Sequence, residues 1–247
     1  MSLQGATALI TGAGSGIGRG VALRAGKEGM NVVVADIKGH DKVAEEIMAA
    51  GGQASAAPLD VRDPLAWEEV VGQATSDYEK IDLLVNNAGV VSEGLDNAVD
   101  QSDEQWDRVI SINLKGYFNG MRAVMPSMIE AGGGAIVNVS SVAGLVGMVN
   151  VFTYSAAKGG VIGMSRQAAV EYAKSGIRVN VICPGIIETP ILGDITDELR
   201  AHCEAFTPVA RLGKPDDIAA MAIHLGKPES AFVTGQVIAV DGGWTAQ

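Results

Sequence analysis

The sequence predicts an α/β fold in which a parallel sheet carries helices on both faces. Apolar runs of strand length alternate with amphipathic stretches of helix length, which is the pattern of repeated strand–helix–strand units. The strand runs are apolar without interruption, so both faces of the sheet are expected to be covered. The 247 residues contain no linker, low-complexity segment or charge block that would divide them, which fits one large domain.

The elements follow one another along the whole chain. The predicted strands are 6–10, 31–35, 53–60, 81–86, 135–140, 177–183 and 236–240, of which 53–60 is the weakest. The predicted helices are 16–29, 41–50, 64–78, 103–129, 154–175 and 215–226. In such sheets, ligands bind beyond the carboxyl ends of the strands, where the winding reverses. Functional residues are therefore expected directly after the strands.

The charge of the chain disfavours several classes of partner. The formal net charge is −11, from 18 Lys and Arg against 29 Asp and Glu. Nucleic acid and anionic membranes call for basic patches, so both are disfavoured, and an acidic carrier protein is disfavoured more weakly. No apolar run approaches the length of about 18 residues that a membrane helix needs, and no signal peptide is expected before the first strand. We therefore expect a cytoplasmic protein.

Cysteine and histidine usage predicts neither a disulfide nor a metal site. Cys183 lies in an apolar run, which together with the low cysteine content fits a reducing compartment. The three histidines are scattered, and no further ligands cluster around His202 and Cys203.

A glycine-rich turn follows the first predicted strand and opens the first helix. Residues 11–18 read Thr-Gly-Ala-Gly-Ser-Gly-Ile-Gly, which fits T-G-x-x-x-G-x-G. Glycines let backbone amides approach a pyrophosphate, and a helix N-terminus favours its negative charge. Glycine can also serve turn geometry alone, but the position after the first strand favours dinucleotide binding. The residues predicted to bind the cofactor here are Gly12, Ser15, Gly16, Ile17 and Gly18.

Asp36 ends the second predicted strand, eighteen residues after Gly18. A carboxylate at this position can accept hydrogen bonds from the adenine ribose, and it repels a 2′-phosphate. No Arg or Lys lies among residues 13–15, although Lys38 is close. The sequence therefore predicts NAD(H) in preference to NADP(H). Asp60 and Val61, after the weak third strand, are predicted to hold the adenine.

Two later strand ends carry further candidates for the cofactor site. Asn87, Ala88 and Gly89 follow the fourth strand and either let a cofactor pass or simply brace the sheet. The sixth strand leads into a turn where the nicotinamide end of a cofactor would lie, and the candidates there are Pro184, Gly185, Ile187 and Thr189. The weakly periodic residues 186–211 predict a mobile lid over the substrate, with an ordinary surface helix as the alternative.

The segment from Ser141 to Lys158 offers a hydroxyl, a phenol and an ammonium. Tyr154 and Lys158 are four residues apart, so they share one face of a helix. A nearby cation favours the phenolate and lowers the pKa of tyrosine from its usual value of about 10. Ser141 at the end of the fifth strand would complete a site that moves a proton onto or off a substrate oxygen. A Tyr and a Lys at this spacing also occur by chance in many helices.

Asn113 lies inside the long helix predicted over 103–129. Asparagine is not a strong helix former, so a local irregularity is expected there. Its side chain or carbonyl group could hold a water molecule, and a structural role is equally compatible with the sequence.

Taken together, these motifs resemble the short-chain dehydrogenase/reductase family from Thr11 to Gly243. The matching motifs are the glycine turn, Asn-Asn-Ala-Gly at 86–89, Asn113, a serine thirteen residues before the tyrosine, Tyr-x-x-x-Lys at 154–158 and Pro-Gly at 184–185. Each motif is modest, but their order and spacing in one chain are specific. The resemblance implies a Rossmann fold with a doubly wound, seven-stranded parallel sheet.

The resemblance also implies roles for the site residues. Tyr154 would be the acid/base, and Lys158 would lower its pKa and bind the nicotinamide ribose. Ser141 would orient the substrate oxygen; Ser140 is the neighbouring hydroxyl, but the thirteen-residue spacing favours Ser141. Asn113 would hold a water molecule in a proton relay to Lys158. The family further implies a homotetramer formed through the helices at 103–129 and 154–175.

The expected reaction is reversible hydride transfer between nicotinamide and a carbon that carries an alcohol or a ketone. Apolar residues between 145 and 152 predict an apolar pocket wall, unless part of that run belongs to the core or to a subunit interface. A small or medium hydrophobic secondary alcohol, or its ketone, is therefore favoured. A 3-oxoacyl thioester, a sugar or polyol and a steroid remain alternatives, and so does a non-catalytic NAD-sensing protein on the same fold.

Overall fold

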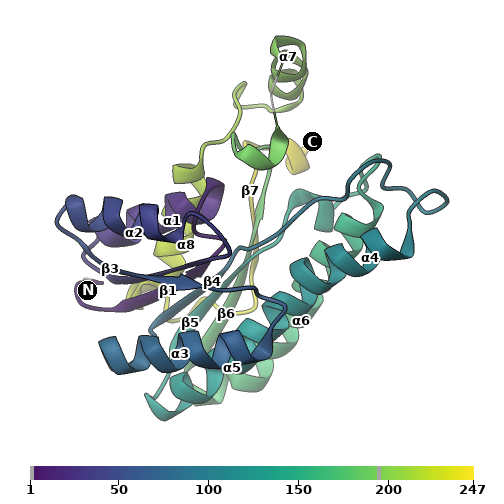
Figure 1. Cartoon of the computed structure of the whole chain (residues 1–247). Coiled ribbons are helices and arrows are strands. Elements are labelled where there is room, and N and C mark those ends of the chain that lie inside the picture. The colour runs from purple at the N-terminus through teal and green to yellow at the C-terminus, as the bar shows by residue number, and fades with distance from the viewer. Residues whose placement is uncertain (1–2, 194–195) are drawn as a thin grey trace.

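The computed structural model describes residues 3–193 and 196–247, and a parallel sheet of seven strands lies at its centre (Figure 1). The strand order is β3-β2-β1-β4-β5-β6-β7, and every neighbouring pair is parallel. The chain winds outward from β1 through β2 to β3, returns to the other side of β1 and continues from β4 to β7. The winding reverses between β1 and β4, which confirms the predicted doubly wound Rossmann fold.

The elements agree with the predicted segments, apart from small shifts at their ends, a break in the longest helix and one additional helix within the segment predicted as a lid. The strands are β1 (Thr7–Thr11), β2 (Asn31–Asp36), β3 (Gln53–Pro58), β4 (Leu83–Asn86), β5 (Gly134–Val139), β6 (Ile177–Pro184) and β7 (Val237–Val240). The α-helices are α1 (Gly16–Lys27), α2 (His40–Ala49), α3 (Pro64–Tyr78), α4 (Asp103–Ile110), α5 (Gly116–Glu130), α6 (Phe152–Tyr172), α7 (Asp197–Phe206) and α8 (Pro215–Gly226).

Helices cover both faces of the sheet, as the uninterrupted apolar strands predict. Figure 1 shows α1, α2 and α8 on one face and α3, α5 and α6 on the other. Successive side chains of β1 point to opposite faces, so Ile10 joins the apolar cluster under α1 and α8, whereas Leu9 joins the cluster under α3 and α5. Burial of both clusters fixes the sheet as a rigid platform for the residues at its carboxyl edge.

The helix predicted over 103–129 is interrupted by a π-helical turn at Ser111–Lys115, between α4 and α5. Asn113 lies in this turn and is fully buried. Its amide group accepts a hydrogen bond from the Val90 N–H at 2.8 Å and donates one to the Val90 carbonyl at 2.7 Å. The expected irregularity is therefore present, and a pair of bonds to the loop after β4 accompanies it.

The segment predicted as a lid lies beyond the carboxyl edge of the sheet. It contains a short 3₁₀ turn at Pro190–Leu192 and the helix α7, which Figure 1 shows projecting from the body of the protein. Asp194 and Ile195, also within the predicted lid, are outside the described residues. Whether this segment closes over a substrate stays a prediction. In the described part of the chain, no helix is both long and apolar enough to cross a bilayer.

Candidate active site

The glycine turn after β1 has no room for side chains. A Cβ on Gly12 would lie 2.8 Å from the Ala88 Cα, and a Cβ on Gly18 would lie 2.5 Å from the Asn87 Nδ2. Gly12 and Gly16 also have positive φ angles of 64° and 53°, which favour glycine. The turn runs directly into α1, with Ser15 as the residue before the first helical turn. Its exposed amides at a helix N-terminus fit a pyrophosphate group.

Asp36 lies against this turn. One oxygen of its carboxylate accepts the Gly14 N–H at 2.8 Å, and the other accepts the Lys38 N–H at 3.2 Å. A carboxylate has about four acceptor sites, so these two bonds leave capacity for hydroxyl groups of a ligand. The end of β2 and the glycine turn thus form one continuous surface, which fits the ribose next to a pyrophosphate.

The predicted adenine residues are already engaged within the protein. The Arg62 Nε donates to both carboxylate oxygens of Asp60 at 3.0 Å, and the Arg62 Nη2 donates to one of them at 2.6 Å. The hydrogen bonds from Arg62 outweigh burial and hold the pKa of Asp60 below its usual value. The Val61 carbonyl accepts bonds from the Trp67 indole and from Asn119. Contact of Asp60 and Val61 with adenine stays a prediction.

Asn87 ties the ends of β1 and β4 together. Its side chain donates to the carbonyl oxygens of Thr11 and Gly12, at 3.0 and 3.3 Å. The Thr11 hydroxyl in turn accepts the N–H groups of Asn87 and Ala88, at 3.0 and 3.1 Å. These bonds hold the glycine turn in place, so the bracing role considered for this motif is present in the structure.

Gly89 marks the point where the cofactor surface meets the catalytic candidates. A Cβ at this position would lie 3.3 Å from the Asn113 Oδ1 and 3.6 Å from the Lys158 Nζ. The loop after β4 therefore passes close to Lys158 at a residue that has no side chain.

Ser141, Tyr154 and Lys158 come together at the end of β5 and the start of α6. The Ser141 hydroxyl accepts the Ala143 N–H at 3.1 Å, and it interacts with the Tyr154 phenol in a way that favours a lower pKa of the phenol. The Ser140 hydroxyl points elsewhere, because it donates to the Lys158 carbonyl at 2.8 Å. The serine that meets the phenol is thus the one thirteen residues before it.

The Lys158 ammonium is buried beneath Tyr154. It donates to the Val139 carbonyl at 2.8 Å and to the Tyr117 hydroxyl at 3.1 Å, and its Nζ lies 5.6 Å from the centroid of the Tyr154 ring. Burial lowers the pKa of Lys158 to about 7, although the nearby Cys183 acts in the opposite direction. The lysine therefore titrates near neutral pH.

The expected lowering of the Tyr154 pKa by Lys158 is wrong for this arrangement. The pKa of Tyr154 is raised, because burial of the phenolate outweighs the hydrogen bond with Ser141, and Cys183 adds to the increase. The sequence shows the spacing of Tyr154 and Lys158, but it does not show that the ammonium turns toward Val139 and Tyr117.

Asp96 contacts the start of α6, which the sequence did not reveal. It is buried in the loop after β4, and its carboxylate accepts the N–H groups of Thr153 and Tyr154, at 2.9 and 3.3 Å. Burial alone would raise the pKa of Asp96, but these hydrogen bonds lower it. The carboxylate thus caps α6 at the residue that carries the phenol. No local pattern marks it, because the cap comes from another part of the chain.

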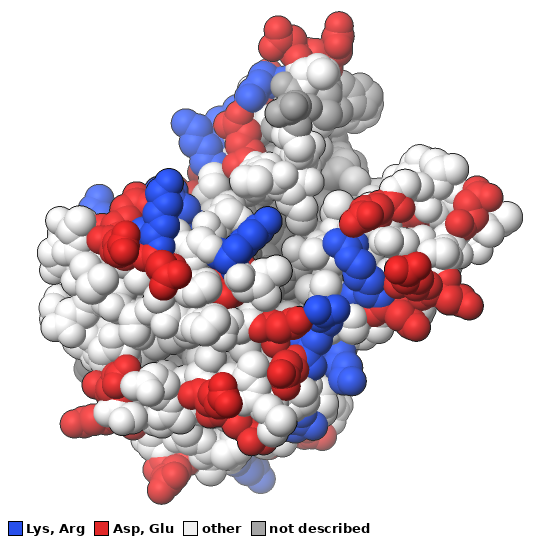
Figure 2. Space-filling view, viewed as in Figure 1, with Lys and Arg blue, Asp and Glu red and all other residues white. Residues whose placement is uncertain are grey.

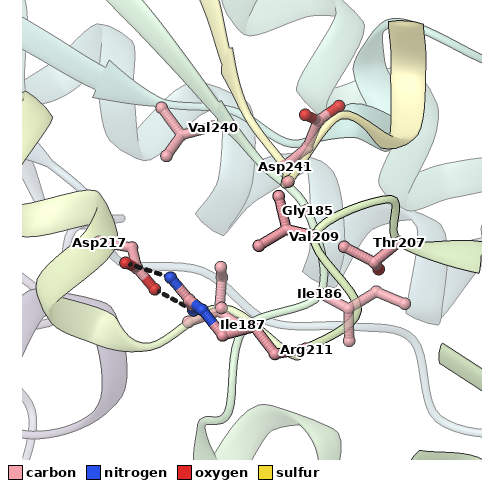
Figure 3. A pocket seen from close by; sticks show the side chains of 11 residues that line it. Gly185, Ile186, Ile187, Thr207, Val209, Arg211, Asp217, Val240 and Asp241 are labelled. Carbon is pink, nitrogen blue, oxygen red and sulfur yellow. Dashed lines mark hydrogen bonds and ion pairs between the residues drawn. The ribbon is translucent and has the colours of Figure 1, made fainter. Parts of the chain in front are cut away.

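A cavity of about 120 Å³ lies at the ends of β6 and β7 (Figure 3). Gly185 and Ile187, both predicted to bind the cofactor, are among its lining residues. Arg211 and Asp217 close one side through two hydrogen bonds of 2.7 and 2.9 Å, drawn as dashed lines. Thr189 lies further along the same loop, with its Cβ 3.3 Å from where a Cβ on Gly16 would be. The loop after Pro184 thus reaches back to the glycine turn.

The segment between Ser141 and Tyr154 carries apolar side chains at the surface. Val149 and Phe152 are 87% and 49% exposed, and Leu145, Val146 and Met148 are also exposed. On the face drawn in Figure 2, red and blue side chains are interspersed rather than gathered into one basic patch. The surroundings of the site are thus apolar next to the catalytic candidates and of mixed charge beyond them.

Comparison with known proteins shows the family. Residues 12–245 match the family described as enoyl-(acyl carrier protein) reductase. The chain is 42% identical over 245 residues to a 3-oxoacyl-[acyl-carrier-protein] reductase of Thermotoga maritima, covering 98% of this chain and 99% of that protein. It is 41% identical over 242 residues to a cyclohexanol dehydrogenase of Acinetobacter sp., covering 97% and 95%.

A solved structure gives the same result. The crystal structure of a short-chain type dehydrogenase/reductase from Mycobacterium marinum superimposes with a TM-score of 0.94, at 33% sequence identity, over 100% of this chain and 98% of that one. With the doubly wound sheet, the glycine turn and the meeting of Ser141, Tyr154 and Lys158, these matches show that the chain is an oxidoreductase and belongs to the short-chain dehydrogenase/reductase family.

Proposed function

We propose that this chain is an NAD(H)-dependent oxidoreductase that interconverts an apolar secondary alcohol and its ketone. The observation that carries the proposal is the meeting of the Ser141 hydroxyl, which favours the phenolate form of Tyr154, with the Tyr154 phenol and the Lys158 ammonium one helical turn away. Two hydroxyl groups at this position can hold and protonate one substrate oxygen.

The shape of the glycine turn supports a dinucleotide, because Gly12, Gly14 and Gly18 pack so tightly against neighbouring segments that a Cβ would not fit, and this keeps the backbone of the turn close to the start of α1, where a pyrophosphate binds. When bound, the nicotinamide supplies the capacity to take or give a hydride. The residues that would hold the cofactor are Gly12, Ser15, Gly16, Ile17, Gly18, Asp36, Asp60, Val61, Asn87, Ala88, Gly89, Tyr154, Lys158, Pro184, Gly185, Ile187 and Thr189.

The protein's own part in the reaction is to move one proton. In the oxidation direction, the Tyr154 phenolate takes the proton of the substrate hydroxyl while Ser141 holds the same oxygen. In the reduction direction, the phenol returns the proton to the ketone oxygen. Because both polar atoms of the Asn113 side chain already bind Val90, a water molecule in a relay to Lys158 would be held by the Asn113 carbonyl group.

The position of Asp36 supports NAD(H) as the preferred cofactor. Its carboxylate is fixed at the glycine turn by the Gly14 N–H, where it would accept bonds from ribose hydroxyls and repel a 2′-phosphate.

The exposed apolar residues beside Tyr154 support a hydrophobic substrate of small or medium size. The similarity to a cyclohexanol dehydrogenase points in the same direction, since that substrate is a small apolar secondary alcohol.

Reduction of a 3-oxoacyl thioester is the second candidate. The similarity to a 3-oxoacyl-[acyl-carrier-protein] reductase favours it. The net charge of −11 counts against docking of an acidic carrier protein, because two acidic surfaces repel each other.

An assay panel separates these candidates. Cyclohexanol, acyclic secondary alcohols, polyols, steroids and an acetoacetyl thioester, or the matching ketones, are each offered with NAD(H) and with NADP(H). We expect the highest kcat/KM with an apolar alcohol and NAD. A preference for the thioester with NADPH contradicts the proposal. Tight NAD binding without turnover of any substrate favours the non-catalytic alternative.

We further propose that the protein assembles as a homotetramer through α5 and α6. A groove of about 410 Å³ lies between these helices, lined mainly by apolar residues such as Met121, Met125 and Met164. Phe118 and Ile129 line it as well and are 45% and 44% exposed, and exposed apolar side chains grouped in this way favour contact with a second copy.

Light scattering tests the assembly. The wild-type protein is expected to have four times the mass of one chain, and Phe118→Glu is expected to yield smaller species, because it places a charge in the apolar groove. Phe232→Glu is the matched control, since Phe232 is fully exposed and lies outside the groove. A wild-type protein that is monomeric at micromolar concentration contradicts the proposal.

A further inference from the structure

Tyr117 is the unexpected neighbour of Lys158. It lies in the first turn of α5 and is 1% exposed. Its hydroxyl donates a hydrogen bond to the Val139 carbonyl at 2.9 Å and accepts one from the Lys158 ammonium at 3.1 Å. The same ammonium donates to the same carbonyl at 2.8 Å, so the three groups form a closed triangle.

The π-helical turn accounts for the position of Tyr117. Asn113 in that turn is anchored to Val90, and Tyr117 follows four residues later, about one turn along the same face. The anchored turn therefore directs the Tyr117 side chain toward β5 and the lysine.

The geometry restricts what this hydroxyl can do. Its own proton is committed to Val139, and the side chain has no path to solvent, so it does not pass protons out of the site. Its lone pair faces a buried cation, and a hydrogen bond to a charged group in a dry environment is stronger than one between neutral groups. The contact therefore favours the charged form of the lysine.

We propose that Tyr117 is a positioning residue for the reaction, whose hydroxyl holds the Lys158 side chain in its charged form beneath Tyr154. This inference rests on the proposed function, because Lys158 matters to turnover only if Tyr154 is the acid/base. The hydrogen bonds of the Tyr117 hydroxyl go to Val139 and Lys158, so it acts on the reaction through the lysine.

Titratable side chains from three elements surround Lys158. Tyr154 on α6 lies above it, Tyr117 approaches from α5, and the Cys183 thiol faces it from β6. Burial raises the pKa of Cys183, and the charge of Arg166 acts in the opposite direction. Burial already brings the pKa of Lys158 down to about 7, so the loss of one acceptor changes its charge at neutral pH.

The first test is an NMR titration of lysine ε-carbons in the cofactor-free protein, with Lys158→Met used to identify the Lys158 signal. The wild-type midpoint is expected near 7. In Tyr117→Phe, the midpoint is expected to fall by about one pH unit, because one hydrogen bond to the charged form is lost. An unchanged midpoint in a folded variant overturns the proposal.

The second test is the pH profile of alcohol oxidation. In Tyr117→Phe, the midpoint of the alkaline decline in kcat/KM is expected to move downward by about one unit, in step with the charge of Lys158, so activity at pH 7 falls about fivefold. Loss of thermal stability with an unchanged midpoint would mean that the hydroxyl is only structural. Tyr78→Phe, which removes a hydroxyl from the end of α3, should change neither readout.

A milder substitution guards against misfolding. If Tyr117→Phe does not fold, 3-fluorotyrosine at position 117 keeps the shape but makes the hydroxyl a weaker acceptor, so both midpoints should move in the same directions by less. No shift there overturns the proposal as well. A wild-type protein without NAD(H)-linked turnover would contradict the proposed function, whereas the NMR titration would still decide the role of Tyr117.

Discussion

Tyr154→Phe is expected to lower kcat for alcohol oxidation by about 10²–10⁴-fold, the range that general acid–base catalysis contributes. The substitution removes one oxygen and leaves the ring, so α6 and its cap at Asp96 should remain in place. NAD binding, measured by fluorescence titration, should change little, because all but two of the predicted cofactor contacts lie outside α6. The loss should therefore appear in kcat rather than in cofactor affinity.

Two comparisons sharpen this experiment. Ser141→Ala removes the hydroxyl next to the phenol and should also lower kcat. The loss of kcat in the combined variant should be smaller than the product of the two single losses, since both groups act on one oxygen. Tyr78→Phe serves as the control for the loss of a hydroxyl elsewhere. Near-normal turnover in Tyr154→Phe would remove this residue from the mechanism.

Asp36→Asn is expected to lower the ratio of kcat/KM with NAD to that with NADP by about 10²-fold, because a hydrogen bond to a charged group is worth about 10–100-fold and repulsion of the 2′-phosphate disappears. Asparagine keeps an oxygen that can accept the Gly14 N–H, so the glycine turn should hold its shape. The measurement is initial-rate kinetics with each cofactor at saturating substrate.

Asp41→Asn provides the matched control for charge. Asp41 lies in the first turn of α2, five residues further along the chain, and its side chain is 78% exposed. Removing its charge should leave the cofactor ratio unchanged. If Asp36→Asn leaves the ratio unchanged as well, the carboxylate does not contact the ribose.

Much of the fold could be predicted because the central strands are long and apolar, although β3 gives only a weak signal. Segments such as 135–140 and 177–183 are buried on both faces, so their composition leaves few alternatives to a central strand. The glycine turn could be predicted as well, because close contacts at Gly12 and Gly18 exclude any residue with a side chain.

What the sequence could not show depends on contacts between distant segments. The bonds between Asn113 and Val90, at the π-helical turn, join residues 23 positions apart, and those between Lys158 and Tyr117 join residues 41 apart. The pKa of Tyr154 depends on burial, which spacing along one helix does not reveal. For this reason, the sequence identified the catalytic candidates but not the direction in which their surroundings shift their pKa values.

The cap at Asp96 has a consequence for protein engineering. The loop after β4 begins beside the expected cofactor and continues to the amide groups that start α6, so it is also the anchor of the phenol. Exchanging this loop between relatives in order to alter selectivity would move the acid/base along with the pocket wall. A transplant that retains the acid at position 96, together with Gln101 and Thr153, which bond to it, preserves the alignment while leaving the rest of the loop open to redesign.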